Sequence, residues 1–130
     1  MESIVGIQVV DAHSHFMTYD TIKAWLESGS SLDRMEQRAR QLTDIERFEL
    51  PEEGMDTGQL WADEMDKYSI TSIGFMVEEE AWEEFNGARK RFPGYSMGYA
   101  VIDPVKENAV DLVNRAGVDD FQGIKLYPSS

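Results

Sequence analysis

The sequence contains no cysteine. Disulfide bonds, cysteine-ligated zinc and thiol nucleophiles are therefore excluded, and the composition fits a reducing compartment. The sequence also lacks an apolar run that approaches the roughly 20 residues needed to span a bilayer. Its first residues lack the basic region and the small-residue cleavage site of a signal peptide. We therefore expect a cytoplasmic protein that does not act at a membrane.

Basic residues are scarce, because 12 Lys and Arg stand against 25 Asp and Glu and give a formal net charge of -13. Such a field repels phosphate backbones and anionic lipids, so nucleic acid and membranes are poor partners. Acidic residues in this number usually lie on solvated helix faces, so the charge alone does not indicate a cation site. The 130 residues are 42% hydrophobic, which is enough apolar matter for a folded core.

Strand-like and helix-like patterns alternate along the chain. The first apolar run is β-branched and nearly continuous, which is typical of a parallel strand buried on both faces. Strands are expected at residues 4–10, 70–77, 95–102 and 123–127. Helices are expected at residues 20–28, 32–48, 57–68, 79–92 and 104–116, the last one beginning at an Asp-Pro pair. This alternation predicts βα units around a parallel sheet.

The predicted fold class is α/β, as the N-terminal half, about four βα units, of a TIM-type (β/α)8 barrel. A closed barrel of this kind needs about 250 residues. The fourth predicted strand is followed by no helix that would cover its outer face, and open sheet edges are usually avoided. We therefore interpret residues 1–130 as one partial barrel domain that is truncated at its C-terminus.

A candidate metal site follows the first predicted strand. Asp11, His13 and His15 lie at i, i+2 and i+4, so alternation along a strand would put their side chains on one face. They also lie at the carboxyl end of the strand, where barrel enzymes carry their active sites. Two neutral imidazoles on one face can bind one divalent ion. Asp11 could orient a histidine from behind or contact the metal itself.

Several segments resemble a known family. Val9–Phe16 resembles the first-strand signature of the amidohydrolase superfamily. Residues 61–68 resemble the connection before the second strand in its amidohydrolase-related (amidohydrolase 2) branch, and Asp103-Pro104 resembles the end of its third strand. Residues 123–128 resemble the ending of its fourth strand. These motifs occur in the family's order, and the resemblance covers essentially the whole chain.

The resemblance implies a metal-dependent hydrolase barrel. Its members use a metal-activated water to attack a C–N or C–O bond of a small molecule, and related members are metal-dependent decarboxylases. Zinc is the expected ion, with manganese or iron as alternatives. The family completes its metal site with a histidine from the fifth strand and an aspartate from the eighth, and a sixth-strand histidine assists. We therefore expect the catalytic residues to lie beyond residue 130, and the 130-residue fragment alone to bind metal weakly and to be inactive.

Two residues near the fourth strand are candidates for substrate binding. Lys125 could bind a substrate carboxylate, although a structural ion pair is the simpler interpretation. A carboxylated lysine that bridges two metals occurs at this strand in some superfamily members. Tyr127 could donate a hydrogen bond to substrate or serve only in packing. The expected partner is a small-molecule substrate, for which a carboxylate is one candidate, and a homo-oligomer is also compatible with the sequence.

Two other functions remain open. A TatD-like metal-dependent nuclease also begins with Asp-x-His-x-His, but Lys125 stands where its fourth strand would carry a glutamate ligand, and a charge of -13 is poor for binding DNA. A non-catalytic α/β assembly module would pair its open sheet edges with another chain. Such a module would need neither His13 nor His15.

Overall fold

The computed structural model describes residues 6–28, 31–45 and 49–127. The chain divides into two compact units, one formed by residues 1–16 and 56–130 and the other by residues 17–55. We call them the sheet unit and the helical unit. The sheet unit contains the strands β1 (Val9–His15), β2 (Ile70–Val77), β3 (Ser96–Val101) and β4 (Gly123–Lys125).

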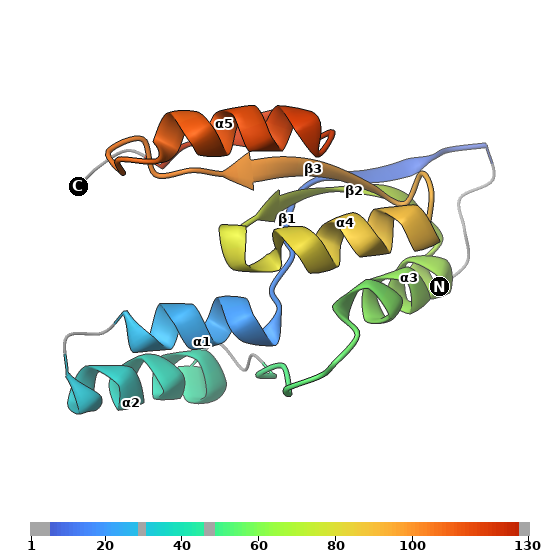
Figure 1. The fold of residues 1–130 in the computed structure, drawn as a ribbon. Helices are drawn as coiled ribbons and strands as arrows, with labels where there is room; N and C mark the ends of the chain where they lie inside the picture. The colour runs from blue at the N-terminus through green and yellow to red at the C-terminus, as the bar shows by residue number, and fades with distance from the viewer. Residues whose placement is uncertain (1–5, 29–30, 46–48, 128–130) are drawn as a thin grey trace. The chain divides into compact units, whose positions relative to one another are not determined.

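The four strands form one sheet in the order β1-β2-β3-β4 (Figure 1). Every neighbouring pair is parallel. All carboxyl ends of the strands therefore lie along one edge of the sheet. The prediction of an α/β fold with a four-stranded parallel sheet is confirmed.

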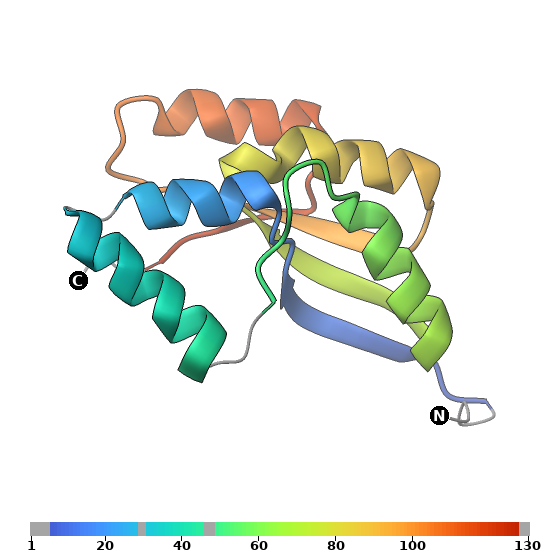
Figure 2. The same cartoon turned by 90° about the horizontal axis from the view of Figure 1, so that it is seen from below.

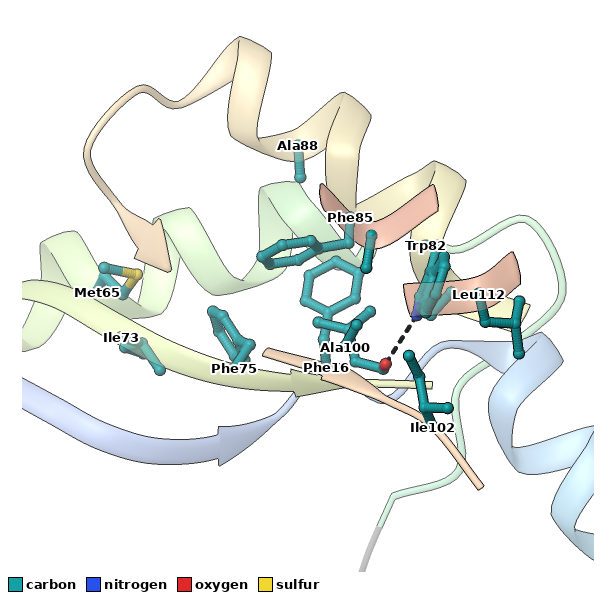
Figure 3. Packing of buried hydrophobic residues seen from close by; sticks show 13 residues of the cluster. Phe16, Met65, Ile73, Phe75, Trp82, Phe85, Ala88, Ala100, Ile102 and Leu112 are labelled. Carbon is teal, nitrogen blue, oxygen red and sulfur yellow. Dashed lines mark hydrogen bonds between the residues drawn. The ribbon is translucent and has the colours of Figure 1, made fainter. Parts of the chain in front are cut away.

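Three helices of the sheet unit pack on the same face of this sheet (Figure 2). They are α3 (Thr57–Tyr68), α4 (Trp82–Arg91) and α5 (Ala109–Val118). A short 3-10 turn, Glu79–Ala81, precedes α4. The core between helices and sheet is built from alternate strand residues and one stripe of each helix, as Figure 3 shows. The strands contribute Ile73, Phe75, Val77 and Ala100, and Ile102 follows directly after β3. The helices contribute Met65, Trp82, Phe85, Ala88, Leu112 and Ala116.

Local signals explain the bounds of α3, which agree with the predicted helix. The Asp56 side chain accepts a hydrogen bond from the Gln59 N–H at 3.0 Å and so caps the helix. Arg91 donates to both Asp56 oxygens at 2.7 Å. The Arg91 hydrogen bonds, followed by that from Gln59, lower the pKa of Asp56 to about 2. At the other end Ser69 adopts a left-handed conformation with φ of 55° and ends the helix.

The prediction that the first strand is buried on both faces is wrong for the part that the structure describes. Val9 is 43% exposed and Val10 is 50% exposed. The reason is topological: within the described residues, β1 lies at the edge of the sheet and pairs with β2 alone. The strand also begins later than expected, at Val9, and predicted strand residues 4–5 lie outside the described residues.

The predicted helix start at Asp103-Pro104 is also wrong, because α5 begins at Ala109. The Asp103 carboxylate accepts from the Val105 N–H at 3.1 Å, so it closes a turn rather than capping a helix. A second turn follows, in which the Ala109 N–H donates to the Lys106 carbonyl at 3.1 Å. The Asp-Pro pair therefore forms a turn before α5, whereas the sequence analysis expected it to begin the helix.

The helical unit contains α1 (Tyr19–Glu27) and α2 (Leu32–Arg40), which is continued by a π-helical turn, Gln41–Ile45. Arg38 donates to the Trp25 carbonyl at 2.6 Å and also lies 5.1 Å from the centroid of its ring, so it joins the two helices. The predicted helix of residues 32–48 loses its regular α-helical form after Arg40, and residues 46–48 lie outside the described residues. Across the described ranges, no helix combines the length and the apolar character needed to cross a membrane.

Candidate metal centre at the carboxyl edge of the sheet

His13 and His15 converge at the end of β1. Their Nε2 atoms are 3.4 Å apart, and their ring centroids are 5.2 Å apart. Two nitrogen ligands at 2.0–2.1 Å from a tetrahedral zinc ion are about 3.3–3.4 Å apart, by simple geometry. The separation is long for a hydrogen bond between the rings. The arrangement of the two nitrogens therefore fits a shared divalent ion.

A bulge in β1 produces this arrangement, which simple strand alternation does not. Asp11 pairs with Ile73 and Ser14 pairs with Phe75, so three steps along β1 match two steps along β2. The Asp11 carboxylate accepts a hydrogen bond from the backbone N–H of His13 at 2.9 Å, across the bulge. Asp11 thus holds the backbone that carries the first imidazole. Its predicted role behind the histidine rings or on the metal stays a prediction.

Gly74 in β2 makes room for the bulge. A Cβ atom at this position would lie 2.9 Å from the Ala12 carbonyl oxygen and 3.2 Å from the Tyr99 ring. The backbone oxygen cannot move aside without moving β1. We expect Gly74→Ala to reduce the free energy of unfolding by about 1–3 kcal/mol and to weaken zinc binding by displacing His13. Chemical denaturation and zinc calorimetry on the same variant measure the two effects.

Gly87 supplies the matched control for that substitution, because a Cβ atom there meets nothing within 4 Å. Gly87 lies within α4, where alanine is the better helix former. Gly87→Ala should leave zinc binding unchanged and should not destabilise the fold. Equal zinc affinity in both variants would show that β1 does not depend on the close approach at Gly74.

The electrostatic surroundings favour the neutral form of the second imidazole. Partial burial lowers the pKa of His15 below its usual 6.5, and the charges of His13 and Lys125 lower it further. Neutral imidazole is the form that binds metal. Lys125 contributes to this shift although its strand, β4, lies at the opposite edge of the sheet from β1.

Lys125 and Tyr127 extend the site along the carboxyl edge. The Lys125 Nζ lies 5.2 Å from the centroid of the Tyr127 ring. Lys125 is half-buried, whereas Tyr127 is exposed and lies just past the end of β4. Burial raises the pKa of the Tyr127 hydroxyl, and the charge of Glu78 raises it further. The structure therefore brings the two predicted substrate-binding residues together at the carboxyl end of β4, and their role in substrate binding stays a prediction.

Glu78 is a neighbour that the sequence analysis did not single out. It directly follows β2 and is half-buried. Burial raises the pKa of the Glu78 carboxyl, the charge of Glu80 raises it further, and Lys106 opposes the shift. The available signal for Glu78 was an acidic residue directly after a buried strand. Two more glutamates follow it, and such a run is also typical of a solvated helix start.

Across residues 6–28, 31–45 and 49–127, no group of three or more His, Asp or Glu side chains is arranged to hold a metal ion. The histidine pair is therefore the candidate centre that this part of the chain offers. Catalytic zinc usually has three protein ligands and an open position. The two imidazole nitrogens fit a zinc ion in ligand type and in spacing. At least one further protein ligand is needed to complete such a site.

Comparison with known proteins adds no relative to this description. Neither the protein-family models, nor the curated proteins, nor the solved structures contain a match to the chain.

Proposed function

We propose that this chain carries the first metal ligands of a (β/α)8-barrel enzyme of the amidohydrolase type. His13 and His15 hold a divalent ion, zinc first and manganese or iron as alternatives. The reaction is hydrolysis of a C–N or C–O bond in a small molecule, or a metal-dependent decarboxylation. The single observation that carries the proposal is the 3.4 Å separation of the two Nε2 atoms.

The topology of the sheet unit supports the barrel. In a doubly wound sheet the strand order reverses at a switch point, and helices cover both faces. Here the strands follow one another in sequence order, and the core is built from α3, α4 and α5 on one face. Right-handed crossovers that always advance in one direction give this arrangement, which is that of a (β/α)8 barrel.

Each residue of the site has a distinct role in this proposal. A bound divalent ion supplies a water of lowered pKa and polarises a substrate oxygen. His13 and His15 hold the ion in their neutral forms, and Asp11 fixes the backbone between them. Lys125 attracts an anionic group of the substrate, and the Tyr127 hydroxyl donates a hydrogen bond to it. The remaining metal ligands come from barrel strands other than β1 to β4.

The test is direct observation of the two imidazoles during addition of zinc to the full chain. Nitrogen-15 resonances of both Nε2 atoms should shift together and saturate at one zinc per chain. Coordination through these atoms removes the protonated imidazole form, so one proton or less should be released near neutral pH. Zinc binding that leaves both Nε2 resonances unchanged would refute the proposed centre.

Exposed apolar residues at the sheet edge favour a second candidate function, which is assembly with another copy of this chain. Ile124 and Leu126 at the β4 edge are 40% and 51% exposed, and Val10 on β1 is 50% exposed. Since β1 and β4 are both open parallel edges, β4 of one copy can pair with β1 of another. Sedimentation should then detect a dimer that Ile124→Lys weakens and Val118→Lys does not. A monomer at about 100 μM, far above the Kd of a stable dimer, would exclude this function.

A further inference from the structure

The strongest unexplained feature of the site is the carboxyl group of Glu78. Side chains at alternate positions share a sheet face, so Glu78 continues the row of Gly74 and Met76, opposite to the row of Phe75 and Val77 that packs against the helices. Gly74 and Gly123 both approach the Tyr99 ring, which identifies this second face on β2, β3 and β4. Glu78 thus ends on the face that also carries Lys125.

Glu78 differs from Glu79 and Glu84, which both have partners within the described part of the chain. Glu79 lies 3.9 Å from Arg115, and Glu84 accepts a hydrogen bond from the Thr57 N–H at 3.1 Å. Among the described residues, the Glu78 carboxyl makes neither a hydrogen bond nor an ion pair, although it is half-buried. A carboxyl that is withdrawn from water without a partner is costly unless it carries a proton or awaits a ligand.

The ionisable groups around Glu78 come from three parts of the sheet unit. Glu80 lies on its own segment and Lys106 on the connection after β3, and both act on its pKa. Tyr127, after β4, responds to its charge, and Lys125 links Tyr127 to the histidine pair. The register places these groups along the carboxyl edge: His15 pairs with Met76, two residues before Glu78. Val77 pairs with Ala100, and the next β3 residue, Val101, pairs with Lys125, so Glu78 and Lys125 lie at the same level on either side of β3.

We propose that Glu78 is the proton-transferring residue of this site and that Lys125 and Tyr127 form its anion subsite. The proposal rests on the function proposed above and adds a substrate class: small molecules with an anionic group near the bond that breaks. The anion binds at Lys125, which lies across β3 from Glu78 on the same face of the sheet. Glu78 then reaches the atom that needs a proton.

The proton balance in hydrolysis is simple. Water adds to the substrate carbon as its C–N or C–O bond breaks, and the leaving nitrogen or oxygen takes the proton of the Glu78 carboxyl. The proton that the water releases restores that carboxyl. In decarboxylation the Glu78 proton goes to the carbon that loses carbon dioxide, and a solvent proton restores the carboxyl. A raised pKa suits an acid that works near neutral pH.

Methanesulfonate is a suitable probe because it stays anionic across the whole pH range of the test. The experiment uses the full chain with His13→Ala and His15→Ala, so that imidazole titration does not contribute. Binding is followed by the Lys125 and Tyr127 side-chain resonances. We expect methanesulfonate to bind at least about fivefold more tightly when Glu78 is protonated than when it is charged. This is a usual size for the coupling between two sites.

Glu78→Gln should abolish this pH dependence, whereas Glu83→Gln, an equal charge change at an exposed position of α4, should preserve it. Equal pH dependence in both variants, or no response of Lys125 and Tyr127 to the probe, would overturn the proposal. Zinc binding by the unmodified histidine pair is measured separately. The two experiments can therefore refute the proposed anion subsite without refuting the proposed metal centre, and the reverse.

Discussion

Replacing His13 and His15 together with alanine is expected to reduce zinc affinity by more than about a hundredfold. Loss of a residue that merely supports a metal ligand already costs about 10–100-fold, and this change removes two ligands. No other group of three or more His, Asp or Glu in the described ranges is arranged to take over the ion. Isothermal titration with zinc at pH 7, on both proteins, measures the change.

The acidic surface makes a matched control necessary for that experiment. With 25 Asp and Glu, the chain can bind zinc weakly through unrelated carboxylates. Glu52→Gln with Glu53→Gln removes two such exposed groups and keeps both histidines. This control should bind zinc as the unmodified chain does. If it lost as much affinity as the double alanine variant, the bound zinc would be on the surface and not at the end of β1.

Strand alternation explains only part of the arrangement of His13 and His15. Alternation in a strand correctly predicted that His13 and His15 share one side. Alternation did not predict the bulge between Asp11 and Ser14, because a bulge depends on how β1 pairs with β2. The contact of Ala12 with Gly74 joins two segments that are far apart in the sequence. No local pattern in residues 9–16 contains that information.

Helix and strand bounds were predictable where the signals were local. Asp56 caps α3 and Ser69 ends it, and both act within one turn of the helix that they bound. The start of α5 was not predictable in this way, since Asp103 can cap a helix or close a turn. Burial of β1 was likewise missed, because hydrophobicity of a segment does not say whether its strand is central or at an edge.

The surroundings of Glu78 could not be predicted from the sequence. Its importance depends on Tyr127 and Lys106, which belong to segments that follow other strands. Parallel topology brings these segments together at the carboxyl edge, whereas the sequence separates them widely. Lys125 was singled out because its strand ending resembles a family motif, and its role stays a prediction, whereas no such motif includes Glu78.

Trp82→Ala should cause the largest loss of stability, about 3–5 kcal/mol of the free energy of unfolding. Trp82 is fully buried, and its Nε1 donates to the Val77 carbonyl at 2.9 Å, so the change leaves a cavity and an unpaired acceptor at the end of β2. Trp25→Ala is the matched control. Trp25 is 38% exposed in the helical unit, and its loss should cost less than about 1 kcal/mol. Urea denaturation followed by circular dichroism compares the two variants. Similar losses would mean that the core under α4 stabilises the fold no more than a partly exposed ring does. The sheet would then need another source of stability.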